Sequence, residues 1–462
     1  MRPTLAACLR RWSSFLLLLS CSFWLATCLR AGPELTTAPS ESSPALTLWW
    51  SKGFYPAEDQ ALERAVAAWS AQSQQTAELR FIDEDDLLQQ ANQALAAGTP
   101  PDILFSVKAD FTNTPRWAWD NQLADLSEVI APVADRYSPS ALAAANFYNA
   151  TTQSRAYYGV PIEQQTLHAH YWRDLLAEAG VSEAAIPTTW DAFWDFWVQV
   201  REQLAGDIGA LGLTLSQPAV DTFFQFEQFL EAYDVAVLDG EGQLQVDQPA
   251  VRDGLVQVLT WLLDRYRTGA IPTAAVDWLD ADNNASFLNR QVLMTLNPSL
   301  SIPGSQRADP EIYQEQMATM GLPQEPDGEP PNYLVGVKQA IVFAQAPHPE
   351  AARDFLRFLV QPETLGAYVK GSQGRWFPVM PELWADPFWN DPADPHVVAG
   401  VKQFRAGQTR PFYSVLNPAY AQVQAENVWG EALQRMIGEG ETATQAAAWA
   451  IARIQAIFAA WS

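Results

Sequence analysis

Apolar positions follow two different periods in the hundred or so residues that begin at position 45. The runs 45–50, 79–82 and 102–106 are short and mostly apolar, which is typical of strands buried in a sheet. Between them, residues 57–72 carry Leu62, Val66 and Trp69 at helical spacing, and residues 86–97 predict a second helix. Strands that alternate with helices in this way predict an α/β fold with parallel pairing.

A second patterned segment follows Pro187. Large apolar side chains recur there every three or four positions: Trp190, Phe193, Trp194, Trp197 and Val198. We interpret this stripe as core packing, because a helical period explains it without a ligand. Thr188, with Asp191 three positions later, predicts a side-chain cap at the start of this helix. A last helix is expected at about 441–460.

Composition indicates a large acidic globular protein. The chain has 462 residues, 48% of them hydrophobic, so two or three structural units are expected. Its formal net charge is −25 at pH 7. Such acidity repels phosphate backbones, and we therefore expect no nucleic acid partner.

The N-terminus has the features of an export signal. Arg10 and Arg11 precede an apolar run that is too short to span a membrane comfortably, so residues 1–27 are expected to be a signal peptide. The sequence Leu-Ala-Thr-Cys ending at Cys28 resembles a lipobox, which implies a lipid anchor at Cys28. Thr27 departs from the usual small residue, and cleavage to a free protein is the alternative. Residues 28–44 are expected to form a flexible tether.

The sequence gives little indication of catalytic or metal-binding groups. Neither H-E-x-x-H, G-x-S-x-G, a phosphate-binding loop nor C-x-x-C is present, and all three cysteines lie in the first 28 residues. His168 and His170 are expected to point to opposite sides of a strand, or apart on a helix, so we predict no metal site there. The acidic runs 83–86 and 277–282 lack the order of a calcium loop, and they are interpreted as loop or helix-start carboxylates. We therefore expect neither a catalytic site nor a cofactor or metal.

Several motifs in one order resemble family 1 extracellular solute-binding proteins, the sugar-capturing components of ABC importers of the maltose-binding type. The stretch from Tyr158 contains G-V-P-I-E-Q-Q and Y-W-R-D-L-L, and P-T-T-W-D follows. Before it comes G-T-P-P-D-I-L-F at 98–105. After it come F-L-N near 289 and F-L-R-F-L-V-Q-P-E-T at 355–364.

The resemblance implies a periplasmic-binding-protein type II fold, with two α/β lobes joined by crossover hinge segments. Lobe 1 would contain residues 45–160 and 318–372, and lobe 2 residues 161–317 and 373–462. Such a protein is expected outside the cytoplasm, in the periplasm or on the cell surface. It would be a monomer that closes on a mono- or oligosaccharide and delivers it to an ABC permease.

Two alternatives remain open at this point. The same fold binds other solutes, such as a polyol, a polyamine, a glycerol phosphate or a metal chelate. A secreted carbohydrate-active enzyme would need two carboxyl groups facing each other across a cleft, and a single sequence does not show such a pair.

Candidate contact residues come partly from the resemblance and partly from aromatic positions. The family's ligand positions imply Gln165 in the G-V-P crossover, with its neighbour Gln164 as the alternative. An amide both donates to and accepts from a hydroxyl. The resemblance also implies the loop after D-I-L-F, with Ser106, Lys108 and Asp110, and the second-lobe loop with Asn297 and Ser299. Predicted loop or strand-end positions add Trp50, Lys52, Arg375, Trp376, Tyr413 and Trp429. Leu300 stands where the family often has a tryptophan, and Trp376 or Trp429 would replace it.

Overall fold

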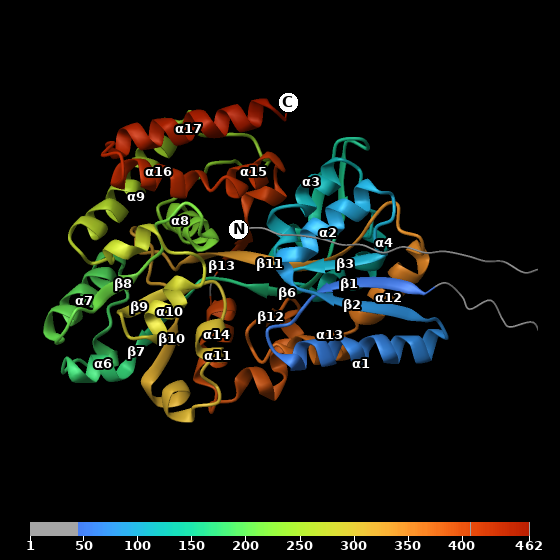
Figure 1. Cartoon of the computed structure of the whole chain (residues 1–462), viewed down its shortest axis with the longest axis horizontal. Coiled ribbons are helices and arrows are strands. Elements are labelled where there is room, and N and C mark those ends of the chain that lie inside the picture. The colour runs from blue at the N-terminus through green and yellow to red at the C-terminus, as the bar shows by residue number, and fades with distance from the viewer. Residues whose placement is uncertain (1–44, 407, 462) are drawn as a thin grey trace, which may run out of the picture. The chain divides into compact units, whose positions relative to one another are not determined.

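Two β-sheets, each with its own hydrophobic core, organise the part of the chain that the computed structural model describes, residues 45–406 and 408–461 (Figure 1). The predicted signal peptide, tether and Cys28 lie outside the described residues. We call the larger sheet and the elements that share its core lobe 1, and the smaller sheet with its core lobe 2. This is the expected two-lobed α/β fold.

Lobe 1 contains a seven-stranded sheet in the order β12-β6-β11-β3-β1-β2, with β13 paired to the start of β11. The strands are β1 (Leu46–Ser51), β2 (Ala77–Ile82), β3 (Ile103–Ser106), β6 (Val160–Gln165), β11 (Asn332–Val342), β12 (Phe377–Pro378) and β13 (Gln408–Pro411). As predicted, β1 pairs in parallel with β2 and β3. Strand β11 is antiparallel to both β3 and β6.

Lobe 2 contains a four-stranded sheet in the order β10-β7-β9-β8. Its strands are β7 (His168–Trp172), β8 (Gly209–Gly212), β9 (Val292–Asn297) and β10 (Met317–Met320). A separate hairpin joins β4 (Asn146–Asn149) to β5 (Ser154–Tyr157).

Helices cover both sheets. Those whose apolar side chains enter the lobe 1 core are α1 (Pro56–Ser73), α2 (Glu84–Ala96), α3 (Thr114–Trp119), α4 (Ser127–Ile130), α5 (Pro139–Ala145), α12 (Pro349–Leu359), α13 (Pro362–Gly371) and α14 (Pro395–Ala406). Those of lobe 2 are α6 (Arg173–Glu178), α7 (Trp190–Gln203), α8 (Val220–Ala232), α9 (Pro249–Arg267), α10 (Asp282–Leu288), α11 (Ser301–Gly304), α15 (Ala419–Ala425), α16 (Val428–Ile437) and α17 (Ala443–Ala459). A short helical turn, η1 (Ala109–Phe111), follows β3.

The aromatic stripe of α7 is core packing, as predicted. Trp190, Phe193, Trp194 and Trp197 are all buried in the core of lobe 2. The predicted cap is wrong, because the helix begins at Trp190 after Thr189, and no side-chain cap bond is made there.

The chain crosses between the lobes at places that differ in part from the expected bounds. Strand β6 ends in the larger sheet, and β7 begins the smaller one three residues later. The return crossing lies within β11, since Leu334 belongs to the lobe 2 core and Val335 to that of lobe 1. Strand β10, expected in lobe 1, pairs with β7 in lobe 2. The segment from Phe377 to Phe404, expected in lobe 2, packs in the lobe 1 core because β12 pairs with β6.

Helix α14 faces both lobes with different chemistry. Its apolar residues Val397 and Val401 are buried in the lobe 1 core. On its other side Gln403 donates to the Leu167 carbonyl at 2.6 Å and accepts from His168 Nδ1 at 2.7 Å. His396 is hydrogen-bonded through Nδ1 to Thr319 Oγ1 of β10 at 2.6 Å. The helix therefore joins lobe 1 through apolar packing and lobe 2 through hydrogen bonds.

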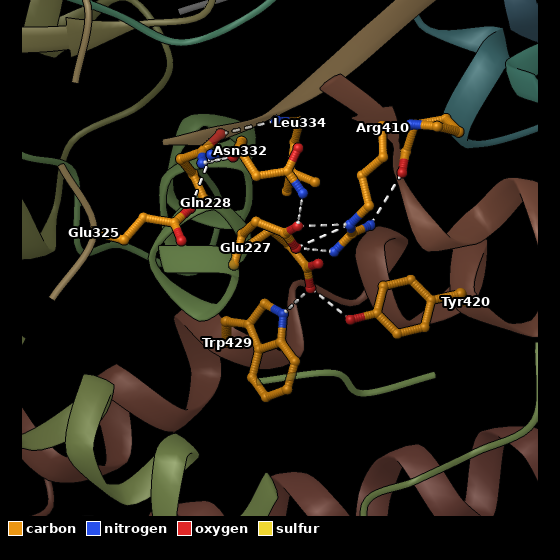
Figure 2. A network of polar contacts seen from close by, with 10 residues as sticks. Glu227, Gln228, Glu325, Asn332, Leu334, Arg410, Tyr420 and Trp429 are labelled. Carbon is orange, nitrogen blue, oxygen red and sulfur yellow. Dashed lines mark hydrogen bonds and ion pairs between the residues drawn. The ribbon is translucent and has the colours of Figure 1, made fainter. Parts of the chain in front are cut away.

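A polar network holds the first residues of β11 to helix α8 of lobe 2 (Figure 2). Gln228 Nε2 donates to the Asn332 carbonyl at 2.7 Å, while its Oε1 accepts from the Leu334 amide at 3.0 Å. Its neighbour Glu231 pairs with Arg410 of β13. The side-chain amide of Gln228 thus makes the pair of hydrogen bonds to β11 that the backbone of a neighbouring strand would make. It does so at the point where β11 passes from one core to the other.

Candidate ligand-binding cleft

A cavity of about 480 Å³ lies between elements of the two lobes. This volume falls within the roughly 300–1,000 Å³ typical of small-molecule sites. Lobe 1 contributes Val107, Lys108, Phe111, Thr112, Gln165, Arg375 and Trp376. Lobe 2 contributes Gln217, Pro218, Val220, Asp221, Phe224, Asp280, Asn284, Asn297, Pro298, Ser299, Ser301, Gln424, Ala425 and Asn427.

One aromatic contact closes the space between the lobes beside the cavity. Phe111 follows the lobe 1 strand β3, yet its ring packs edge-on against Phe224 of α8, with centroids 5.1 Å apart. It therefore belongs to the hydrophobic core of lobe 2. This contact holds the two walls together in the described conformation.

The lobe 1 wall combines an amide, an indole and a guanidinium. Gln165 is the last residue of β6 and is 6% exposed. Trp376 is buried, and its indole Nε1 has no hydrogen-bond partner among the described residues. The Arg375 guanidinium lies 4.6 Å from the Trp376 ring centroid and 4.9 Å from that of Phe54. This wall offers an apolar face with polar edges, which suits a hydroxylated ring.

The lobe 2 wall is built from amides and a hydroxyl at the end of β9. Asn297 Nδ2 donates to Asn284 Oδ1 at 2.5 Å, and Asn297 Oδ1 accepts from the Ser299 amide at 3.0 Å. Gln424 of α15 is buried, and neither end of its amide has a partner within the described part of the chain. Buried amides normally find partners, so Gln424 presents a donor and an acceptor to whatever occupies the cavity.

One carboxyl group in the cleft has a strongly altered acidity. Burial and, to a smaller extent, the nearby Asp280 carboxylate raise the pKa of Asp221 to about 8, while a hydrogen bond from Asn283 opposes the shift. Asp221 therefore carries a proton through much of the neutral range and can donate as well as accept.

A second hollow, which we call the lobe 1 chamber, adjoins the cleft. Its volume is about 350 Å³, and it shares Val107 and Arg375 with the larger cavity. Aromatic rings and carboxyl groups dominate its lining: Trp50, Phe54, Phe81, Phe105, Tyr368, Glu58, Asp59, Asp83, Glu84 and Glu163. Trp50 and Lys52, both predicted contact residues, lie here rather than in the cleft.

Of the residues predicted from the sequence, the structure brings six together in the cleft: Lys108, Gln165, Asn297, Ser299, Arg375 and Trp376. Five others line neither the cleft nor the chamber: Ser106, Asp110, Gln164, Tyr413 and Trp429.

These five side chains have partners within the protein. Asp110 forms a buried ion pair with Lys338 at 3.2 Å, and burial raises the pKa of Asp110 to about 7. The Ser106 hydroxyl donates to Glu84, and Gln164 Nε2 donates to the Pro378 carbonyl. Tyr413 packs against Tyr420 and under the Arg410 guanidinium. Trp429 is stacked on Phe226 and donates to Glu227.

Sequence reasoning missed Glu163, although a signal for it was available. Alternate residues of a strand share a face, so Glu163 and Gln165 of β6 lie on one side and Gln164 on the other. The lobe 2 residues Gln217, Asp280 and Gln424 were also missed. They belong to three segments far apart in the chain, and no local motif marks them.

The histidine pair is arranged differently from the expectation. His168 and His170 lie on the same face of β7, with ring centroids 6.4 Å apart, because residues two apart on a strand point the same way. Burial lowers the pKa of His168 to about 4 and that of His396 to about 4. Among the described residues, no group of three or more His, Cys, Asp or Glu side chains is arranged to hold a metal. The acidic run at 83–86 lies at the start of helix α2, as interpreted from the sequence, although Asp83 makes no side-chain cap bond.

The sequence of residues 65–397 matches the family model of the bacterial extracellular solute-binding protein. This match covers well over half of the chain. The protein belongs to that family. Members of the family are solute-binding proteins that act outside the cytoplasm, so the folded domain of this solute-binding protein is extracytoplasmic. Within the described residues, no helix has both the length and the apolar character that crossing a membrane requires.

Solved structures with the same fold include ABC transporter solute-binding proteins. One from Thermotoga lettingae, bound with α-D-tagatose, has a TM-score of 0.71 and 18% identity over 90% of this chain and all of that one. The cyclic α-maltosyl-1,6-maltose binding protein of Arthrobacter globiformis gives 0.71 and 19%, over 90% and 98% of the two chains. UgpB of Mycobacterium tuberculosis, in complex with glycerophosphocholine, gives 0.69 and 17%, over 91% and 99%. No curated protein sequence matches this chain.

Proposed function

We propose that this solute-binding protein captures a mono- or oligosaccharide between its lobes and delivers it, chemically unchanged, to an ABC permease. The observation that carries the proposal is the composition of the cleft. Amide and hydroxyl groups of Gln165, Asn297, Ser299 and Gln424 face the same cavity as the Trp376 indole. Sugars present both hydroxyl rims and apolar C–H faces, and this lining complements both.

The binding mechanism follows from the placement of these groups on two different lobes. A ligand that hydrogen-bonds to Gln165 on lobe 1 and to Asn297 on lobe 2 makes its full set of contacts only when the lobes are closed. Such a ligand prefers the closed state and shifts the population toward it. A micromolar affinity, about 8 kcal/mol, suffices for capture and still permits release to the permease.

The fold of UgpB, whose structure holds glycerophosphocholine, favours one second candidate, a phosphodiester or other non-sugar solute. We also propose that the mature protein is a monomer and, from the residues before the described domain, that a lipid anchors it at Cys28. Mass spectrometry of the membrane fraction would detect a diacylated Cys28 as the first residue. An unmodified soluble N-terminus would contradict the anchor.

A thermal-shift panel of sugars, polyols and glycerophosphodiesters tests the function. A true ligand at about 100 times its Kd stabilises the folded protein by roughly 2.7 kcal/mol, and the effect follows the ligand concentration. Gln165→Ala should weaken the response, whereas Gln199→Ala, on the exposed face of α7, should leave it unchanged. A panel in which no carbohydrate stabilises the protein would refute the sugar assignment.

A further inference from the structure

Glu163 is the buried carboxyl group of the lobe 1 chamber to which no described residue donates a hydrogen bond; the Ser51 hydroxyl and Arg375 Nε, which also line the chamber, have no hydrogen-bond partner either. It lies on β6, is only 2% exposed, and lines the chamber. Among the described residues, no group donates a hydrogen bond to its carboxyl, although buried polar groups are normally satisfied. A buried carboxyl group that faces a hollow of about 350 Å³ without a partner points to a ligand group that supplies one.

The other carboxyl groups of the chamber are already engaged. Glu58 Oε1 accepts from the Tyr55 amide at 3.0 Å, and Asp59 Oδ1 accepts from the Gly53 amide at 2.8 Å. Glu84 accepts from the Ser106 hydroxyl at 2.5 Å. The exposed Asp83 lies 3.9 Å from the Lys52 ammonium. These groups make the chamber acidic, and they leave Glu163 and the Ser51 hydroxyl as buried acceptors without a donor among the described residues.

The charge and the rings of the chamber select one kind of ligand group. Five carboxyl groups line it against the two cations Lys52 and Arg375. The lining also holds five aromatic rings, and aromatic faces attract cations. The Arg375 guanidinium already lies against one of these rings, that of Phe54, and against Trp376 of the cleft. The combination of excess carboxyl groups with aromatic faces favours a cationic nitrogen over an anion or a neutral hydroxyl.

We propose that the lobe 1 chamber binds a cationic nitrogen of the captured solute, the ammonium group of an amino sugar, and that Glu163 accepts its hydrogen bond. The sugar part of this inference rests on the proposed function. The chamber and the cleft adjoin at Val107 and Arg375, and the proposal places the ring of the ligand in the cleft and its ammonium in the chamber.

A change in the protonation of Glu163 gives a way to measure this binding in solution. Its carboxyl is surrounded by Glu58 of α1, Tyr368 of α13, Lys338 of β11 and Arg375 before β12. Burial and the Glu58 carboxylate raise the pKa of Glu163 well above its usual range, with Arg375 and Lys338 opposing them. Burial thus favours the protonated form of Glu163 in the free protein. An ammonium beside it lowers that pKa, so binding shifts Glu163 toward its ionised form and releases protons to the buffer.

Matched pairs test the proposal: glucosamine with glucose, galactosamine with galactose, and their β-1,4-linked disaccharides, together with spermidine and glycerophosphocholine. In calorimetry at about pH 6, where sugar ammonium groups stay charged, an amino member should bind about tenfold or more tightly than its neutral partner. Glu163→Gln should abolish that preference, whereas Asp83→Asn, which removes the same charge at an exposed position, should change it much less. Equal affinities within every pair, or a preference that survives Glu163→Gln, would overturn the proposal.

Two further outcomes separate the chamber from the proposed function. Binding of spermidine or glycerophosphocholine that is lost in Glu163→Gln would support the chamber and refute the sugar. Binding of neutral sugars only, unchanged in Glu163→Gln, would support the sugar and refute the chamber. Proton release in the unaltered protein, obtained from buffers of different ionisation enthalpy, needs no variant. A cationic ligand that binds without releasing a proton would contradict the role of Glu163.

Discussion

Replacement of Gln228 by methionine should destabilise the protein without changing its volume much. Gln228 is 1% exposed, and its amide satisfies two backbone groups of β11, the Asn332 carbonyl and the Leu334 amide. In Gln228→Met both groups lose their partner, at about 1–3 kcal/mol for each buried group. Because the two costs add, we expect a loss of roughly 2–6 kcal/mol in the free energy of unfolding.

Urea denaturation followed by tryptophan fluorescence measures this loss. The midpoint should fall with the slope unchanged, which indicates lower stability rather than a different unfolded state. Gln199→Met, at an exposed position of α7, is the matched control and should stay within about 0.5 kcal/mol of the original protein. A loss below about 0.5 kcal/mol in Gln228→Met would show that the two bonds do not hold β11 to α8.

The remaining predictions concern the cleft and buried titrating groups. Trp376→Ala should weaken ligand binding by about 2 kcal/mol in calorimetry, and Trp376→Phe by less; unchanged affinity would place the indole outside the binding surface. The pKa of Asp221 is raised to about 8, so its contribution to stability is complete below its unfolded value and is lost as the pH rises through 8. Asp221→Asn should flatten the decline in melting temperature from about pH 4 to 8, and an unaltered slope would contradict the shift. The pKa values of His168 and His396 are lowered to about 4, so their contribution is present above about 6.5 and is lost as the pH falls through 4. His396→Gln should lower the midpoint pH of acid unfolding, and a midpoint that stays the same would contradict this assignment.

Local patterns predicted most of the fold. The alternation of strands and helices in the first hundred residues of the domain, and the aromatic face of α7, follow from side-chain period alone. The lobe bounds did not follow, because strand pairing decides them. Residues 377–378 enter lobe 1 only through their bonds to β6, a partner more than two hundred positions earlier.

The lobe 1 residues of the candidate site were easier to predict from the sequence than most of the lobe 2 residues. Gln165 and Trp376 lie in segments that carry recognisable motifs, and both face the cavity. Asn284, Gln217 and Gln424 share a wall only because lobe 2 folds around its own core. Asp110 was predicted to contact ligand but pairs with Lys338 instead. This ion pair follows only from the placement of β11 beside η1, which the sequence does not show.

The two faces of α14 determine how the halves of the molecule can separate. Pulling Val397 and Val401 away from their neighbours would expose hydrocarbon to solvent, for which water offers no replacement contact. Breaking the bonds of Gln403 and His396 exposes polar atoms that water can hydrate at once. When the cleft opens, α14 therefore moves together with lobe 1, which it contacts through Val397 and Val401. Water enters along its opposite side, where Gln403 and His396 face lobe 2.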